Sequence, residues 1–237
     1  MESALTTPKP HYQMNPEFLP ACTELGLSLT QAQVELFDAF EEALYAANSV
    51  MNLTRVPQEE CWLRHFIDSL LFHDLIPDGS TVLDIGTGPG FPAWPLACAR
   101  LDLNLTALDS SGKMLGFLRN QVLPNLDIVQ VRAEEWGVRD VFDVVTGRAL
   151  APLAIQLELS APLAKEGGIV LPMRTPSEEP EIRAIGTEKL GLQLENVVHR
   201  SLPGTEITRT FAVYRKIAPT QAKFPRPWAE MKRKPLT

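Results

Sequence analysis

The stretch Thr81-Val-Leu-Asp-Ile-Gly-Thr-Gly-Pro-Gly90 decides the fold of this chain. An apolar strand is predicted at Thr81–Ile85, and a helix is predicted to begin near Pro92. The glycines between them allow positive φ angles and let the backbone approach a ligand closely. The helix would point its first N–H groups at that ligand. The order of strand, glycine-rich turn and helix favours a ligand site over a glycine-rich turn that binds nothing.

The spacing of the glycines separates two classes of ligand. Gly86, Gly88 and Gly90 follow the pattern Gly-x-Gly-x-Gly, whereas dinucleotide-binding proteins use Gly-x-Gly-x-x-Gly. Asp84, just before the turn, would repel a pyrophosphate and attract a positive group such as the ammonium of an amino acid. We therefore expect a ligand with a cationic group rather than a diphosphate.

After residue 80, short apolar strands alternate with helical stretches. This alternation predicts an α/β fold whose mostly parallel sheet is covered on both faces. Only residues 200–208 separate the last two strands, too few for a helical crossover, so these strands should pair antiparallel. The expected strands are Thr81–Ile85, Asn104–Leu108, Asp127–Val131, Phe142–Thr146, Gly168–Pro172, Leu192–His199 and Arg209–Lys216.

Two further strand ends complete a candidate ligand site. Asp109 ends the second strand, where a carboxylate commonly accepts hydrogen bonds from both hydroxyls of a ribose. The alternative is that Asp109 caps the next helix. The third strand ends before Ala133 and Glu134, whose backbone would read an adenine. Neighbouring strand ends form one crevice, and ribose, adenine and an amino-acid tail without phosphate favour S-adenosylmethionine over NAD.

The region before the sheet is predicted to be helical. Thr30 is a candidate N-cap for a helix with apolar residues every three to four positions, and a second helix is expected over Gln58–Leu75. The first residues are polar and aperiodic, which is typical of a mobile arm. The expected units are the arm (1–16), an N-terminal helical extension (17–78), a main α/β domain (79–217) and a C-terminal tail (218–237).

Charge is distributed unevenly along the chain. The formal net charge is -7, yet the segment from Arg215 to Thr237 carries seven basic residues and one acid. The tail mixes cations with Phe224 and Trp228, a combination that suits the phosphates and exposed bases of nucleic acid. The alternative is a solvated tail whose two aromatic residues pack back on the domain.

Composition excludes several classes of protein. No run approaches the ~18 apolar residues of a membrane span, and the first residues lack the pattern of a signal peptide. Cys22, Cys61 and Cys98 lie far apart, without the spacing of a disulfide framework or a zinc site. We expect a cytoplasmic protein with no membrane association and no metal.

In combination, these residues resemble the ribosomal RNA small subunit methyltransferase G family, also called GidB. No single motif is decisive, but the motifs occur in the family's order over roughly residues 50–237. One departure is Arg174-Thr175, where the family usually has Lys-Gly. The motifs are Asn52-Leu53-Thr54, Arg64-His65-x-x-Asp68-Ser69, Asp84-Ile-Gly-Thr-Gly-Pro-Gly-Phe-Pro92, Leu108-Asp109-Ser110, Arg132-Ala-Glu134, Gly147-Arg148-Ala149, Pro162-Leu-x-x-x-Gly167-Gly168 and Pro225-Arg226 followed by Lys234-Pro235-Leu236.

The resemblance implies a class I S-adenosylmethionine-dependent methyltransferase behind an N-terminal helical extension. Its Rossmann-like sheet would have seven strands, mostly parallel, with one antiparallel strand. The implied reaction is methyl transfer to N7 of a guanine in 16S rRNA, at position 527 in the 530 loop. The partner would be 16S rRNA or the 30S subunit, including its precursor, and a monomeric enzyme is expected. The alternatives are a small-molecule methyltransferase on the same core and a non-catalytic, cofactor-binding, RNA-associated protein.

The candidate site residues follow from the strand ends and from the resemblance. Guanine N7 carries a lone pair and no proton, so direct in-line transfer needs no general base. Arg148 would orient the substrate, or hold a phosphate or the methionine carboxylate. His65 would form a wall of the guanine pocket; alternatively, a His65–Asp68 pair docks the extension on the core. Expected cofactor contacts are Asp84, Gly86, Gly88, Phe91, Asp109, Ser110, Ser111, Ala133, Glu134 and Arg148. Expected RNA contacts are Arg64, Lys113, Arg174, Lys223, Arg226, Lys232, Arg233 and Lys234.

Overall fold

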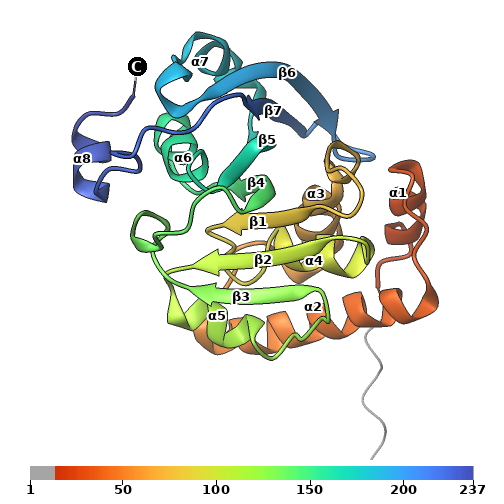
Figure 1. Cartoon of the computed structure of the whole chain (residues 1–237). Helices are drawn as coiled ribbons and strands as arrows, with labels where there is room; N and C mark the ends of the chain where they lie inside the picture. The colour runs from red at the N-terminus through yellow and green to blue at the C-terminus, as the bar shows by residue number, and fades with distance from the viewer. Residues whose placement is uncertain (1–13, 237) are drawn as a thin grey trace, which may run out of the picture.

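The computed structural model describes residues 14–236, and its strands form one seven-stranded sheet (Figure 1). The strands are β1 (Thr81–Ile85), β2 (Asn104–Asp109), β3 (Leu126–Gln130), β4 (Phe142–Arg148), β5 (Ala164–Arg174), β6 (Leu192–Ser201) and β7 (Thr208–Lys216). Their order along the sheet is β3-β2-β1-β4-β5-β7-β6. Only β7 runs against the others, because it pairs antiparallel with both β5 and β6 while all other pairs are parallel.

The predicted fold class is confirmed, a mostly parallel α/β sheet with one antiparallel strand. β5 differs most from its prediction, since it extends beyond Gly168–Pro172 at both ends. The glycines there form an irregularity inside the strand rather than its start: Phe142 pairs with Ala164, whereas Val144 pairs with Ile169. Residues 1–13 of the predicted mobile arm lie outside the described residues.

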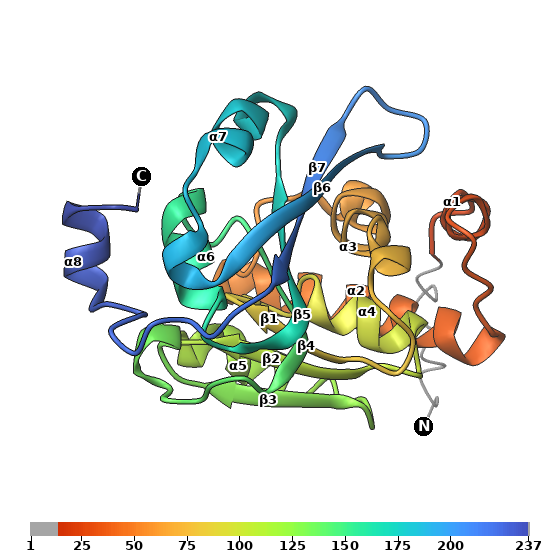
Figure 2. The ribbon, with the colours of Figure 1, turned by 45° about the horizontal axis from the view of Figure 1, so that its top comes forward.

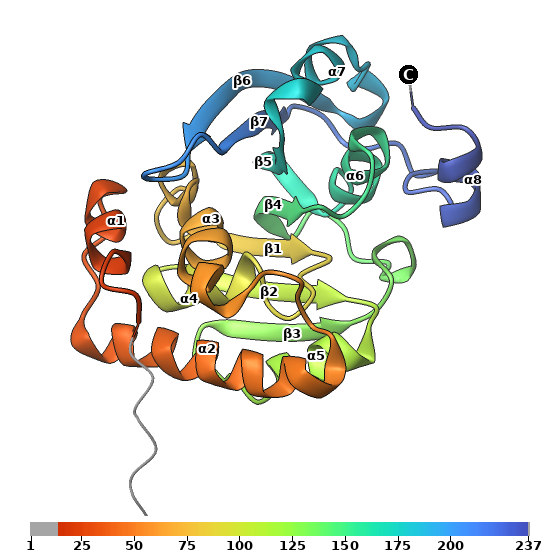
Figure 3. The ribbon, with the colours of Figure 1, turned by 180° about the vertical axis from the view of Figure 1, so that it is seen from behind.

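Helices cover both faces of the sheet. Figure 3 shows α2 (Gln31–Met51), α4 (Ala93–Ala99) and α5 (Gly112–Leu118) in front of the strands. The other face packs against α6 (Leu153–Ser160). Within residues 14–236, no helix is long and apolar enough to cross a membrane. The remaining elements on or after the sheet are η4 (Ala133–Glu135), η5 (Pro176–Glu178), α7 (Glu179–Ala184), η6 (Glu188–Leu190) and α8 (Trp228–Arg233).

Successive strand residues enter two separate apolar cores, as the period of a strand requires. Val82 belongs to the core that contains α2 and α4, whereas its neighbour Leu83 belongs to the core that contains α6. Val144 and Val145 of β4 are divided in the same way. Burial on both faces fixes the register of the strands and so the positions of their carboxyl ends.

The N-terminal helices pack on the α4 face. α1 (Phe18–Glu24) precedes α2, which begins after the predicted N-cap Thr30. The Thr30 hydroxyl accepts a hydrogen bond from the Gln33 N–H, and the Gln33 side chain accepts one from the Thr30 N–H. Gln33 also donates to the Cys98 carbonyl of α4 at 2.7 Å. Phe37 of α2 packs edge-on against Trp94 of α4, so the extension is fixed to the sheet by polar and aromatic contacts.

The prediction of one α-helix over Gln58–Leu75 is wrong. The segment is broken into short helical pieces, one of which is a π-helix containing His65. Wider π turns occur frequently at functional sites, and here His65 and Asp68 are both held by partners outside the segment. The pieces are η1 (Gln58–Glu60), the π-helical η2 (Trp62–Ile67), α3 (Asp68–Leu70) and η3 (His73–Leu75).

The C-terminal tail folds back on the domain. Figure 2 shows α8 on the opposite side of the molecule from α1, and Figure 1 shows it on the side toward which β1, β2 and β3 point. Phe224 and Met231 are buried. Arg226 binds both carboxylate oxygens of Glu158 in α6, at 2.8 and 2.6 Å. The alternative in which both aromatic residues pack back on the domain is therefore correct, although Trp228 is only half-buried.

Candidate functional site

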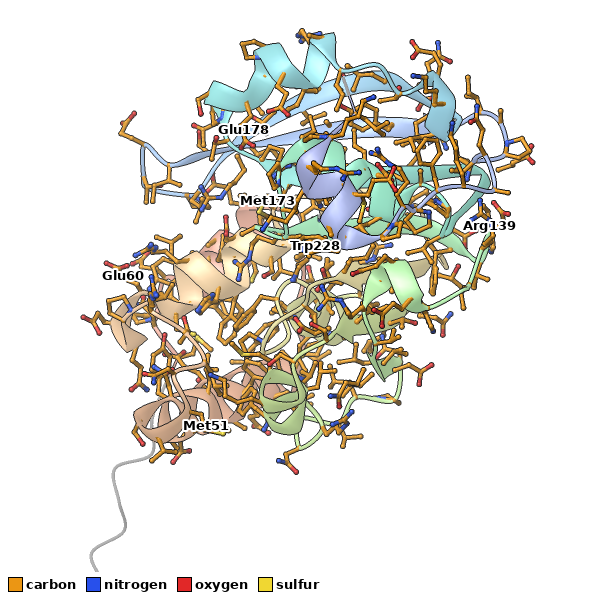
Figure 4. The ribbon with its side chains drawn as sticks, turned by 90° about the vertical axis from the view of Figure 1, so that its left-hand side faces the viewer. Met51, Glu60, Arg139, Met173, Glu178 and Trp228 are labelled. Atoms are coloured by element: carbon orange, nitrogen blue, oxygen red, sulfur yellow. The ribbon has the colours of Figure 1, made fainter. Side chains whose placement is uncertain are left out.

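Two cavities open at the edge of the sheet where the parallel strands end, the face seen in Figure 4. The first, of about 190 Å³, lies at the ends of β1, β2 and β3. The second, of about 400 Å³, lies at the ends of β4 and β5. Leu150 lines the first and Ala149 lines the second, so the two cavities are neighbours. A larger hollow of about 710 Å³ at the opposite edge is lined by none of the predicted site residues.

Residues from six separate stretches of the chain form the first cavity. In Figure 4, Trp228 marks its C-terminal wall, while Met173 and Glu178 mark the second cavity. The first cavity is lined by Ile85, Gly86, Leu108, Asp109, Ser110, Val131, Arg132, Ala133, Glu134, Leu150, Leu159 and Trp228. Most of these side chains are apolar, and the polar ones gather at the ends of β2 and β3.

The glycine-rich loop brings backbone to the first cavity. Gly86 and Gly88 have φ angles of 74° and 58°, which favour glycine. The N–H of Gly86 donates to the Leu108 carbonyl at 2.7 Å and ties the loop to β2. A Cβ atom at residue 86 would lie 2.6 Å from a methyl carbon of Leu150, which lines the same cavity. Only a glycine therefore fits at this position without displacing the cavity wall.

Asp109 lies at the centre of the strand ends. Its Oδ2 accepts from the Gly88 N–H at 2.9 Å, and its Oδ1 accepts from the Ser111 N–H at 2.7 Å. The alternative that Asp109 caps the next helix is wrong, because the N-cap of α5 is Ser111. A carboxylate has further lone pairs after two such bonds. Asp109 is thus fixed in place and still able to accept hydrogen bonds from a vicinal diol.

The end of β3 supplies another wall. Ala133 and Glu134 line the cavity from the short helix η4. Arg132 donates from Nε to the Glu134 carboxylate at 2.8 Å, and its guanidinium carbon lies 6.0 Å from the centre of the Trp228 ring. Arg132 is the one cation among the described residues that line this cavity, and it is paired with Glu134.

Asp84 lies behind the loop rather than in the cavity. Its side chain is fully buried and accepts from the Ala93 N–H at the start of α4, at 3.1 Å. Burial raises the pKa of Asp84 to about 7, although hydrogen bonds from Thr87 and Ala93 oppose this rise. Asp84 does not line the first cavity, and its direct contact with a ligand stays a prediction. Asp84 braces the loop against α4.

The second cavity is built around one buried carboxylate. Asp68 accepts from Arg148 Nη1 at 3.0 Å and from Arg209 Nε at 2.7 Å. This places the N-terminal extension against the ends of β4 and β7. The cavity is lined by Val56, Arg64, His65, Asp68, Arg148, Ala149, Met173, Arg174, Thr175, Glu178 and Arg209. Cations outnumber acids in this list, and this cavity suits an anionic or electron-rich partner.

His65 is a buried, neutral wall of the second cavity. Its Nδ1 accepts from Arg148 at 3.2 Å, and its Nε2 lies 2.7 Å from the Thr54 hydroxyl. The ring stacks on Phe91 at 4.1 Å. Burial, with the charges of Arg148 and Arg64, lowers the pKa of His65 to about 3. The alternative of a His65–Asp68 pair is wrong, because both residues bind Arg148 instead.

Arg148 and Phe91 belong to the second cavity more than to the first. Arg148 donates to Asp68, to His65 and to the Arg64 carbonyl, and its guanidinium lies 5.3 Å from the centre of the Phe91 ring. Phe91 is buried beneath these groups. Neither residue lines the first cavity, so any contact of Phe91 or Arg148 with the cofactor would lie outside the pocket for ribose and adenine.

The predicted cofactor residues thus separate into three sets. Two of them, Phe91 and Arg148, lie at the second cavity. Three others stand behind the first cavity and hold its loop or Asp109: Asp84, Gly88 and Ser111. The remaining five line the first cavity: Gly86, Asp109, Ser110, Ala133 and Glu134.

The predicted RNA residues are also divided. Arg64 and Arg174 line the second cavity, and Arg174 is buried with a hydrogen bond to the Ala151 carbonyl. Arg226 is a wrong prediction, since its guanidinium is taken up by buried Glu158. The other five predicted cations are exposed: Lys113 on α5 and, in the tail, Lys223, Lys232, Arg233 and Lys234.

Sequence reasoning missed three residues of the site. Arg209 joins Asp68 across 141 positions, and no local pattern marks that contact. Trp228 was expected to face RNA, yet it lines the first cavity. Glu158 had a visible signal, because it is the one acid in the apolar helix α6. A buried acid predicts a buried partner, and that partner is Arg226.

The first cavity fits an adenosyl group without phosphates. Asp109 offers a carboxylate to a ribose diol, and apolar side chains offer walls to a flat base. The loop that Asp84 braces approaches through glycine, and the single lining cation is paired. S-adenosylmethionine has these features, whereas a dinucleotide needs cations or free helix N–H groups for its phosphates.

Two solved structures share this fold, one with AdoMet bound and one named as a SAM-dependent methyltransferase. The TM-score is 0.52 with M. jannaschii TYW2 in complex with AdoMet, at 18% identity, over 62% of this chain and 74% of that chain. It is 0.50 with a SAM-dependent methyltransferase from Aquifex aeolicus, at 21% identity, over 65% of this chain and 91% of that chain. These likenesses confirm the class I methyltransferase fold.

Sequence comparisons place the chain more narrowly. It is 35% identical to ribosomal RNA small subunit methyltransferase G of Lactobacillus helveticus, over 94% of this chain and all of that protein. It is 36% identical to the protein of the same name from Bacillus subtilis, over 89% and 93% of the two chains. The model of the GidB family, rRNA small subunit methyltransferase G, matches residues 33–210. The chain therefore belongs to the rRNA small subunit methyltransferase G family.

Proposed function

We propose that this protein transfers a methyl group from S-adenosylmethionine to N7 of a guanine in 16S rRNA, at position 527 in the 530 loop. Membership of the family makes the chain an S-adenosylmethionine-dependent rRNA methyltransferase. The observation that carries the finer proposal is that two different cavities are neighbours, one suited to an adenosyl group and one lined with cations. They meet where Leu150 lines the first and Ala149 lines the second.

The first cavity would hold the cofactor. S-adenosylmethionine supplies an electrophilic methyl group on a sulfonium. Asp109 would accept the ribose hydroxyls, and the backbone at Ala133 and Glu134 would meet the adenine edge. Gly86 lets the loop pass close to the ligand, and Asp84 keeps that loop in place. The amino-acid end would then extend past Leu150 toward the second cavity.

The second cavity would hold the guanine. N7 attacks through its own lone pair, so no side chain has to remove a proton. Neutral His65 offers a flat, uncharged wall, and Arg148 has further N–H groups to offer after its three bonds. Arg148 therefore would orient the nucleotide through O6 or a phosphate. Alignment of this kind can supply roughly 7–11 kcal/mol of the barrier reduction.

The surface around the cavities would bind the rest of the RNA. Lys113, Lys223, Lys232, Arg233 and Lys234 are exposed cations of α5 and the tail. We propose that they bind phosphates of 16S rRNA in a 30S particle or its precursor. The working form would be a cytoplasmic monomer, with the extension (17–78), the methyltransferase domain (79–217) and the tail (218–237) acting together.

The test is methyl transfer from labelled S-adenosylmethionine to naked 16S rRNA, to mature 30S subunits and to precursor particles. N7-specific strand scission maps the product. We expect one labelled guanine, at position 527. A label on another atom or another nucleotide contradicts the proposal. Cofactor binding without transfer to any of the three RNAs indicates a non-catalytic binding protein or a small-molecule methyltransferase instead.

A further inference from the structure

One wall of the first cavity comes from the far end of the chain. Trp228 of α8 lines this cavity together with Leu108, Leu150 and Leu159. Its side chain is half-buried, so it is neither a core residue nor a fully solvated one. A large aromatic ring at the open side of an apolar cavity is well suited to stack on a flat base.

Buried contacts hold Trp228 in this position from both sides. Phe224 is 2% exposed and Met231 is 0% exposed. Between them, Arg226 donates to Glu158 from its backbone N–H, from Nε and from Nη2, at 2.9, 2.8 and 2.6 Å. Glu158 is next to Leu159 in α6, and Leu159 lines the cavity. The tail is therefore anchored at the cavity wall itself.

Trp228 also contacts the part of the cavity wall that follows β3. The guanidinium of Arg132 lies 6.0 Å from its ring centre, and Arg132 is paired with Glu134 at 2.8 Å. Glu134 is where the nucleobase edge is expected. The Trp228 ring and the residues that follow β3 therefore line the same part of the cavity from two sides.

The helix that carries Trp228 also carries exposed cations. Lys232 and Arg233 belong to α8, and Lys234 follows it. All three are exposed, and in the described part of the chain no ion pair involves them. One short helix therefore faces the cofactor cavity with its first residue and solvent with its last.

We propose that the segment 224–236 serves both ligands: Trp228 stacks on the adenine of the cofactor, and Lys232, Arg233 and Lys234 bind RNA. RNA bound to these cations would hold α8 against the domain, so each ligand should raise the affinity for the other. The cofactor half rests on the first cavity alone, whereas the coupling half rests on the proposed rRNA substrate.

The cofactor half is tested by titrating S-adenosylhomocysteine into the full-length protein in a calorimeter. We expect Trp228→Ala to weaken binding roughly tenfold or more, as loss of one base–aromatic stack does. Trp228→Phe should recover most of the affinity. Trp62→Ala is the matched control, because Trp62 is half-buried in the extension and lines neither cavity. An affinity of Trp228→Ala within about twofold of the unchanged protein overturns the proposal.

Fluorescence keeps this test valid if Trp228→Ala does not fold. S-adenosylhomocysteine should quench tryptophan emission in the unchanged protein and in Trp62→Phe. The quench should be largely lost in Trp228→Phe, which keeps an aromatic ring of similar shape. An equal quench in Trp228→Phe overturns the proposal.

The coupling half is tested by repeating the titration with saturating 16S rRNA transcribed in vitro. We expect the dissociation constant of S-adenosylhomocysteine to fall several-fold in the unchanged protein, and this gain to vanish in the triple variant Lys232→Gln, Arg233→Gln, Lys234→Gln. An unchanged dissociation constant overturns the shared role of the segment. A separate methyl-transfer assay on the same RNA distinguishes the two proposals, because Trp228 can contact the cofactor whether or not this RNA is the substrate.

Discussion

Asp68 of the N-terminal extension and Arg148 at the end of β4 are 80 positions apart, and their side chains meet at 3.0 Å. The second carboxylate oxygen of Asp68 accepts from Arg209 at the start of β7, at 2.7 Å. A single buried acid therefore positions two arginines that line the second cavity. The extension therefore lines the proposed substrate site as well as covering one face of the sheet.

Asp68→Asn should disable transfer while leaving the cofactor cavity intact. Loss of the charge leaves two arginines without their partner, which should lower the free energy of unfolding by about 3 kcal/mol. Misplaced arginines should lower kcat/KM for 16S rRNA on the order of 100-fold. Affinity for S-adenosylhomocysteine should stay within about twofold, because Asp68 does not line the first cavity. Denaturant unfolding, transfer kinetics and calorimetry measure the three effects.

The control for Asp68→Asn is Asp74→Asn. Asp74 also binds an arginine, Arg200, at 2.6 Å, but its side chain is 46% exposed. Exposed pairs contribute less than about 1 kcal/mol, so this variant should resemble the unchanged protein. Equal effects of the two substitutions would show that burial at Asp68 is irrelevant and would contradict the role given to it.

Asp109→Ala should affect the cofactor alone. Loss of hydrogen bonds to a carboxylate should weaken S-adenosylhomocysteine binding by roughly 1–3 kcal/mol, measured by calorimetry, with RNA affinity unchanged. The triple variant of Lys232, Arg233 and Lys234 should do the reverse, with weaker RNA binding that also depends less on salt. If both changes weakened the same ligand only, two separate sites would not exist.

Glu158→Gln should loosen the tail. Glu158 is 1% exposed and holds Arg226 through both oxygens, so removal of its charge should cost about 2 kcal/mol of stability. Glu195→Gln is the matched control, because Glu195 holds Arg215 in the same two-point manner but is 41% exposed. Thermal unfolding of the two variants tests this. A larger effect at Glu195 would contradict the buried anchor.

The buried carboxyl of Asp84 predicts a pH dependence of stability. Its pKa in the folded protein is about 7, above its usual value of 3.8. The folded state therefore binds the proton more tightly between these values, and stability should fall as the pH rises through that window. Asp84→Asn should remove this fall. Between pH 4 and roughly pH 8, the free energy of unfolding of the variant should rise relative to that of the unchanged protein by a few kcal/mol at most. Urea unfolding across this range measures the difference, and a pH-independent difference would contradict the assignment.

The sequence predicted the elements whose signals are local. β1 spans the predicted Thr81–Ile85 because its residues are buried on both faces and end at glycine. Thr30 begins α2 as its capping pattern requires. The position of Asp109 in the first cavity was also predicted correctly, since the carboxyl end of a parallel strand lies at the edge of the sheet where ligands bind. Local chemistry and the rules of parallel sheets were sufficient for the strand ends of the first cavity, but not for its Trp228 wall.

The second cavity depends on contacts that no local pattern records. The helical periodicity around His65 indicated one α-helix, but partners outside the segment, Thr54 and Arg148, hold its turns in a wider form. The basic composition of the tail indicated RNA contacts throughout, yet Arg226 binds a buried acid 68 positions away. Contacts with residues outside the local segment decided both cases, and they follow from packing rather than from spacing.

A crystal structure with bound S-adenosylhomocysteine is the most direct test of the site. We expect the ribose hydroxyls on Asp109, the adenine between Ala133 and the Trp228 ring, and the sulfur at the opening toward Arg148. Soaks with NAD should leave the same cavity empty. A cavity that stays empty with S-adenosylhomocysteine present, or that accepts NAD instead, would contradict the assignment.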